Sequence, residues 1–293
     1  MTADAITPMF LHLLLPILGA VGSFAGQAIV GAAVSFGLGY LANRLRPQPA
    51  DQAPRGMSLS LQTETNEPRQ VALGRCASAG SLKYHNTYGP NGNDYLQLVF
   101  VLADHECDAL ERVIVNGKSH SLLANESTTW VSGQPVSTYE GRIWVKFHSG
   151  AWGQTADADL VARAKSGGWD ANDRGRGVCY VRVTLKADPQ KFKSGLPEFV
   201  FVFRGAKLYD PRLDTSAGGS GVHRWDDPAT HAWTDNVAVC AYNYLRGIHV
   251  NGALLAGVSA PPSSLPTVDW MAEMNICDEP VARLSVGPEP RYR

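Results

Sequence analysis

The stretch from Arg174 to Arg212 constrains the fold most, because it holds two β-rich runs separated by a connector that neither run can continue through. Residues 178–185 alternate β-branched and aromatic side chains, which is typical of a strand. Residues 199–208 are denser in apolar side chains, as expected of a strand that is buried on both faces. We therefore interpret the stretch as scaffold. Its breaks fall at Asp188-Pro189, Gly195-Leu196-Pro197 and Asp210-Pro211.

Strand and turn signals continue upstream of this stretch. Residues 95–103 have the strongest strand pattern, and Asn116-Gly117 is typical of a type I′ hairpin turn between strands at 110–115 and 119–123. The sequence therefore predicts a mainly β fold with some α, in which residues 56–212 form an antiparallel barrel or sandwich. We also expect strands at 57–62, 70–75 and 142–148, a loop at 84–93 and a short helix at 157–165.

Helical patterns appear in the last segment, 213–293. Residues 234–246 have the pattern of an amphipathic helix with Thr234 as its N-cap, and a second helix is expected at 266–277. A connection rich in Gly and Pro separates the two helices. The side chains expected to face inward are Val237, Cys240, Ala241, Tyr244 and Leu245 in the first helix, and Val268, Met271, Met274 and Ile276 in the second.

The first 46 residues stand apart, because no charge occurs between Asp4 and Arg44. The apolar run is too long for a signal peptide and lacks its positive start. One helix over this run would reach roughly twice the ~30 Å bilayer core, so we expect two helical pieces, followed by a Pro-rich linker at 47–55. Composition favours membrane insertion, and the alternative is a bundle formed with neighbouring subunits. Small residues that allow close helix contact are Gly19, Gly22, Gly26, Ala33 and Gly37.

Charge and cysteine content argue against several function classes. The chain has 26 Lys and Arg against 27 Asp and Glu, so it lacks the basic excess of an electrostatic nucleic-acid binder. Its five cysteines have no metal-ligand spacing, and we interpret them as free thiols. We predict no cofactor and no bound metal.

Two clusters contain residue types that bind metals, and we expect neither to hold one. His105-Glu106-Cys107-Asp108 lacks the second His that a zincin carries four residues on, and is expected to be a polar turn. His223, Asp226, Asp227 and His231 lie close in sequence, but the Asp residues are expected to cap a helix start and the His residues to be exposed. No carboxylate pair or Cys-His arrangement is placed for catalysis, so we predict that the protein is not an enzyme.

Five sequence blocks, in the same order, resemble the tail-tip hub proteins of long-tailed bacteriophages, also called tip attachment protein J, and the hubs of gene transfer agents. The most specific block is Arg204-Gly205-Ala206-Lys207-Leu208-Tyr209-Asp210-Pro211-Arg212. The helix start departs from the family pattern, because Asn236 is followed by Val237 and not by Pro-Ala. The other blocks are 177–186, 192–197 with Gly195 and Pro197, 233–236 opening the helix that runs to Leu245, and 271–279.

The resemblance implies that the block 204–212, with Gly195 and Pro197, has a structural role and not a catalytic one. It implies a homotrimer that caps the tail tube, adapts its sixfold symmetry to a threefold tip and docks on the distal tail protein and other tail-tip proteins. Such a baseplate hub is a virion component made in the host cytoplasm, acts in host attachment and genome ejection, and lets DNA pass without sequence-specific binding. On an axis of this kind the apolar residues 1–46 are expected to form a bundle, with transient membrane contact as the alternative. Hubs of this family are longer, so we expect further domains beyond residue 293.

Two other function classes stay open. The first is a bacterial envelope protein with a β domain, anchored in a membrane by the N-terminal segment. The second is an enzyme such as a cell-wall hydrolase, which some tail tips carry.

Overall fold

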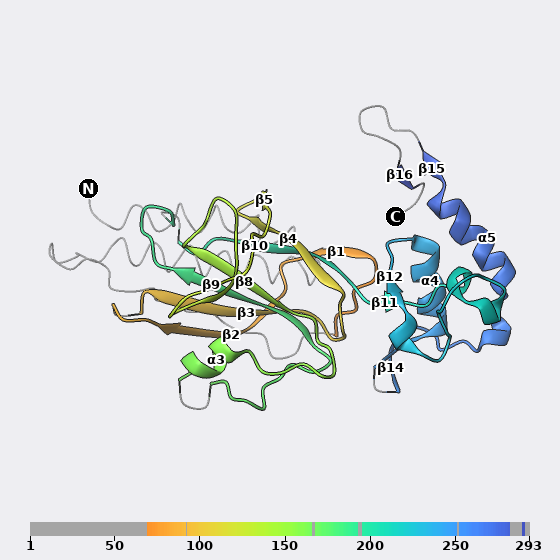
Figure 1. Ribbon diagram of the computed structural model, residues 1–293, viewed down its shortest axis with the longest axis horizontal. Helices are drawn as coiled ribbons and strands as arrows, with labels where there is room; N and C mark the ends of the chain where they lie inside the picture. The colour runs from red at the N-terminus through yellow and green to blue at the C-terminus, as the bar shows by residue number, and fades with distance from the viewer. Residues whose placement is uncertain are drawn as a thin grey trace, which may run out of the picture. The chain divides into compact units, whose positions relative to one another are not determined.

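The computed structural model (Figure 1) describes residues 69–281 apart from 92, 166–167, 193–194 and 251, together with the backbone of 289–290. All of these residues belong to one compact unit, Pro54–Arg293. The N-terminal segment at 1–46 with its five small residues, the linker at 47–55 and the strand expected at 57–62 lie outside the described residues. No helix within the described ranges is both long enough and apolar enough to cross a membrane.

The larger sheet has six antiparallel strands, in the order β2-β3-β9-β8-β7-β6. β9 lies near its centre between β3 and β8, and its first seven residues are all buried. The helix α3 (Ala158–Arg163) packs on one face of this sheet through Leu160, which contacts Val99 and Tyr180. The strands are β2 (Ser81–Tyr88), β3 (Tyr95–Ala103), β6 (Glu126–Ser127), β7 (Ser132–Pro135), β8 (Ile143–His148) and β9 (Cys179–Lys186).

The smaller sheet has four antiparallel strands, in the order β1-β10-β4-β5. Its strands are β1 (Arg75–Ser78), β10 (Phe199–Arg204), β4 (Ala109–Val115) and β5 (Lys118–His120). The turn between β4 and β5 has φ of 49° at Asn116 and 76° at Gly117, so the hairpin predicted there is confirmed.

The two sheets share one hydrophobic core, which confirms the predicted mainly β fold. Leu98 and Val183 from the larger sheet and Val113 and Phe201 from the smaller one belong to the same buried cluster. The rings of Phe100 and Phe201 lie 5.4 Å apart between the sheets. In Figure 1 the strands of the smaller sheet lie above those of the larger one, as in a sandwich.

The chain leaves β10 for a second, smaller core. Tyr209, Val239, Tyr242 and Met274 are buried at its centre. The elements around it are β11 (Lys207–Leu208), β12 (Ala232–Trp233), α4 (Val237–Arg246), β13 (Ile248–Val250), β14 (Ala253–Ala256), α5 (Thr267–Asp278), β15 (Pro280–Val281) and β16 (Glu289–Pro290), with 3-10 turns at Pro211–Leu213, Thr215–Ala217, Pro228–Thr230 and Pro262–Ser264.

Several predicted boundaries are wrong. The first half of the loop expected at 84–93 belongs to strand β2, and the strand expected at 70–75 begins only at Arg75. The single run 199–208 is two strands, because the chain breaks at Gly205 and Ala206. Polar residues such as His85 and Asn86 concealed β2, since an edge strand needs few apolar side chains.

The face predicted for α4 is only partly right, because Cys240 and Leu245 pack against the second core whereas Val237, Ala241 and Tyr244 are exposed. Asn236, not Thr234, is the N-cap, and its side-chain oxygen accepts hydrogen bonds from two backbone N–H groups of the first turn. Val237 and Tyr244 are about half exposed, whereas Ala238, Val239, Tyr242 and Asn243 are buried. In α5, Met274 is buried as predicted, but Val268 and Ile276 are exposed.

We expect Phe201→Ala to lower the free energy of unfolding by about 3–5 kcal/mol, because the fully buried ring joins both sheets. Urea denaturation followed by fluorescence measures this change. Val222→Ala is the control, since Val222 is 73% exposed and its truncation should change stability by less than about 0.5 kcal/mol. An equal effect of the two substitutions would contradict the shared core.

Candidate functional site

The motif 204–212 lies where the chain passes from the β sandwich to the second core. Gly205 allows a close backbone crossing there, since a Cβ atom at this position would lie 2.2 Å from the carbonyl oxygen of Ala72. The Gly205 N–H donates to the Gly74 carbonyl oxygen at 2.8 Å, and the Ala206 N–H donates to that of Ala72 at 2.9 Å. Glycine at position 205 therefore permits a backbone approach that a side chain would block.

Arg204 ties this crossing to the smaller sheet. Its guanidinium lies 3.0 Å from Glu111 and 3.2 Å from Asp108, and 4.7 Å from the centre of the Trp233 ring. Arg75 contacts the same Glu111 at 2.9 Å and reaches Asp235, just before α4, at 3.1 Å. These charged groups thus join β1, β4 and β10 to the segment that opens α4, as expected for an arginine that pairs with carboxylates.

The second half of the motif, residues 209–212, contacts both α4 and α5. The Asn243 side chain of α4 accepts a hydrogen bond from the Tyr209 N–H at 3.0 Å and donates to the Tyr209 carbonyl oxygen at 2.7 Å. Asp210 caps the 3-10 turn that starts at Pro211. Arg212 lies 2.7 Å from both Asp210 and Asp278, so it connects this turn to the end of α5.

The remaining motif residues lie apart from these contacts. Lys207 is exposed, with its amine 4.0 Å from Asp108. Gly195 and Pro197 lie in the connector that enters β10, whereas Arg204 ends that strand, so the structure does not bring the two groups together. Gly195 has a φ of 97°, which favours glycine.

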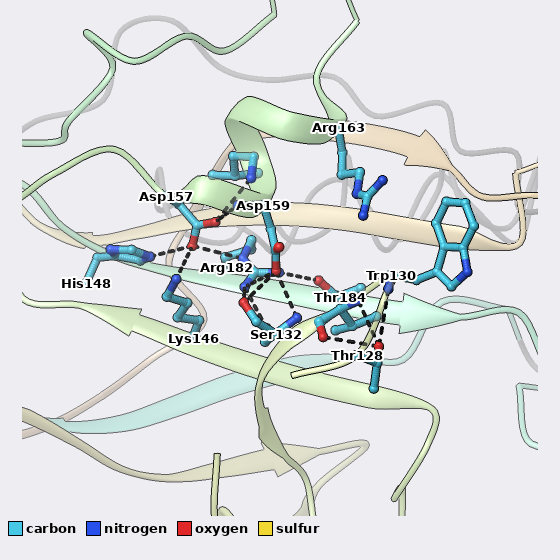
Figure 2. A network of polar contacts seen from close by, with 12 residues as sticks. Thr128, Trp130, Ser132, Lys146, His148, Asp157, Asp159, Arg163, Arg182 and Thr184 are labelled. Carbon is cyan, nitrogen blue, oxygen red and sulfur yellow. Dashed lines mark hydrogen bonds and ion pairs between the residues drawn. The ribbon is translucent and has the colours of Figure 1, made fainter. Parts of the chain in front are cut away.

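A second polar cluster was missed by the sequence analysis. It centres on Asp157, whose side chain is fully buried (Figure 2). One carboxylate oxygen accepts hydrogen bonds from the N–H groups of Asp159 and Leu160 and so caps α3. The other lies 2.7 Å from His148 Nε2, 3.0 Å from Arg182 Nε and 3.4 Å from Lys146 Nζ.

Arg182 extends the cluster across the sheet. Its guanidinium is 1% exposed, and it donates to the Thr184 hydroxyl at 2.9 Å and to the Ser132 carbonyl oxygen at 2.7 Å. Asp159 lies 3.1 Å from the same guanidinium and accepts a hydrogen bond from the Ser132 N–H. Figure 2 shows these side chains converging from α3, β7, β8 and β9.

We call Lys146, His148, Asp157, Asp159 and Arg182 the ion network. Its charges favour the ionised form of the Asp157 carboxyl group. Burial alone would raise the pKa of this carboxyl, but the hydrogen bond from His148 and the charges of Arg182 and Lys146 outweigh burial and hold the pKa well below its usual range. Both carboxylate oxygens are engaged by groups of the protein, one by the first turn of α3 and the other by side chains of β8 and β9. The arrangement therefore anchors α3 to the larger sheet.

An Asp-His pair also occurs in hydrolases, where the second His nitrogen activates a nucleophile. His148 stacks on the Tyr180 ring at 4.4 Å. Within the described ranges, no Ser, Thr or Cys side chain is hydrogen-bonded to His148. Among the described residues, the Asp157–His148 pair therefore has no hydrogen-bonded nucleophile of the kind that such hydrolases use.

Residues from the two clusters of metal-binding residue types make hydrogen bonds within the protein. His105 is buried and its Nε2 accepts the Ala72 N–H at 2.8 Å, while Asp227 caps the turn at Pro228 as predicted. His223 was expected to be exposed but is buried, and its Nδ1 accepts a hydrogen bond from the Asp210 N–H at 3.1 Å. In the part of the chain that the structure describes, no group of three or more His, Cys, Asp or Glu residues is placed to hold a metal ion.

Comparisons with known proteins identify no family for this chain. No protein-family model matches the sequence, and no curated protein matches it. Among solved structures, a chain in "Virion of native gene transfer agent (GTA) particle" is similar at 18% identity and a TM-score of 0.32. The similarity covers 62% of this chain and 39% of that one, so this protein matches about two fifths of that chain's length.

We expect Gly205→Ala to destabilise the protein by about 1–3 kcal/mol, because the added Cβ overlaps the Ala72 carbonyl and two backbone segments must move apart. Thermal unfolding measures the loss. Gly153→Ala is the matched control, since a Cβ there meets no atom within 4 Å. Equal melting temperatures for the two variants would refute the close crossing.

Asp157→Asn should destabilise the protein by about 3 kcal/mol at pH 7, because it leaves the buried Arg182 with a weaker partner. A carboxyl whose pKa is depressed on folding contributes its stability above its unfolded pKa of about 4 and loses that contribution as pH falls below it.

Urea denaturation between about pH 7 and pH 2 tests this linkage, which predicts a shallower acid loss for Asp157→Asn than for the wild type. Asp226→Asn, at an exposed position, should keep the wild-type slope. A wild-type slope in Asp157→Asn would contradict the role of the ion network.

Proposed function

We propose that this protein is a structural component of a phage-like tail tip, the N-terminal part of a trimeric hub that caps the tail tube. The observation that carries the proposal is the contact pattern of the motif 204–212, which is the block most specific to that family. Its residues connect separate parts of the fold: Gly205 crosses the segment at 72–74, Arg204 binds the smaller sheet and Arg212 reaches α5.

A joint of this kind needs rigid connections more than a reactive centre. The β sandwich supplies a wall with a continuous core, and the motif couples that wall to the second core through backbone hydrogen bonds and ion pairs. The charged groups of the ion network are likewise bound to one another and hold α3 to the sheet. These features support a role in which the protein keeps its shape under mechanical force and catalyses no reaction.

The proposal extends to the assembly. Three copies form a ring that adapts the sixfold tube to a threefold tip, docks on the distal tail protein and lets the genome pass during ejection. The uncharged residues 1–46 serve this ring as a bundle on the axis or as a channel lining. The proposed hub takes part in host attachment as well as in genome ejection.

Electron microscopy of the purified full chain, with its distal tail protein added, tests this function. We expect particles with three times the mass of one chain and threefold rings that bind at the end of a tube. Arg212→Ala should reduce ring formation, because it releases α5 from the turn at Pro211. A monomer that needs detergent would favour the membrane-anchored alternative, and a monomer with substrate turnover would favour an enzyme.

A further inference from the structure

A surface loop that is held by hydrogen bonds presents an aromatic ring and two arginines. Gln154 holds it together, since its amide donates to the carbonyl oxygens of Arg174 at 2.8 Å and Gly175 at 3.1 Å, while its oxygen accepts the Gly150 N–H at 3.0 Å. Gly175 and Gly177 have φ of 62° and 72°, so glycine favours this path. We call residues 150–154 and 172–177 the Trp152 loop.

The exposed groups of the Trp152 loop are of the residue types that are enriched in protein–protein interfaces. Trp152 is 58% exposed, and the Arg176 guanidinium lies 5.7 Å from its ring centre. Arg174 and Arg176 border a small hollow of about 260 Å³. Neither arginine has an ion pair among the described residues. Trp and Arg are enriched at binding hot spots, and a loop ordered before binding loses little entropy on contact.

The outer face of α5 has the opposite character. Val268, Ala272 and Ile276 follow one another at intervals of four residues, so they form one apolar stripe, and Val268 is 77% exposed. Asp269 and Glu273 flank this stripe, with no ion pair within the described ranges. The helix contains no Lys or Arg. We call these five residues the α5 outer face.

We propose that the Trp152 loop of one copy docks on the α5 outer face of the next copy, with Trp152 on the apolar stripe and the two arginines on Asp269 and Glu273. Each surface supplies the charge that the other lacks, and each leaves apolar groups uncovered. Two different surfaces make a head-to-tail contact, which closes into a ring when the rotation allows it. This inference rests on the proposed trimer and names the surfaces that build it.

Charge reversal tests the contact in the full chain. Arg174→Glu with Arg176→Glu, or Asp269→Lys with Glu273→Lys, should weaken self-association roughly 30-fold or more, as for loss of a hot spot. All four substitutions in one chain should restore it, because the charges are exchanged and not removed. Sedimentation velocity measures the oligomer in each case. Arg112→Glu is the control, since Arg112 is exposed and lies on β4 in the smaller sheet.

Three outcomes would overturn the contact. Trimers that persist in both double variants exclude these surfaces and leave the proposed hub function standing. A wild-type chain that stays monomeric at about 100 µM excludes the trimer itself. Loss of binding to a single-stranded dT oligonucleotide in Arg174→Glu with Arg176→Glu, with trimers intact, assigns the loop to nucleic acid instead.

Discussion

The buried ion pair between Asp157 and Arg182 constrains how the strands of the larger sheet can be arranged. Taking a guanidinium out of water costs several kcal/mol, so it must meet nearly all of its hydrogen-bonding needs inside the protein. Arg182 does so with partners from α3, β7 and its own strand. A strand that slipped by one residue would turn this charge into the apolar core, and the pair therefore specifies register as well as position.

Much of the fold is local in origin and is accessible from the sequence. β3 has the bounds expected from its apolar run, and the turn at Asn116-Gly117 follows from backbone preferences of two residues. β2 was missed because its side chains are mostly polar, and only its pairing with β3 along the whole strand makes it regular. The face of α4 was misjudged because Asn243 looks like a solvent-facing residue until its hydrogen bonds to Tyr209 are known.

One part of the candidate site could be predicted from the sequence and the other part could not. The motif 204–212 stands out in the sequence through its Gly, Pro and charged residues, and the structure assigns most of them a contact. The ion network has almost no recognisable pattern in the sequence. Its one trace is the alternation of Arg182 and Thr184 with Val181 and Val183, whose side chains face the core between the sheets. Twenty-five positions separate Asp157 from Arg182, and no local rule states that one will neutralise the other.

The crossing at Gly205 has a mechanical consequence. Gly205 and Ala206 each donate one backbone hydrogen bond to the antiparallel segment at 72–74. Tension applied along β10 would strain both bonds sideways at the same time, whereas a peeling force would open them one after another. The orientation of this short seam thus makes the passage between the two cores resist axial pulling more strongly than peeling, and the ion pair between Arg75 and Asp235 spans the same passage.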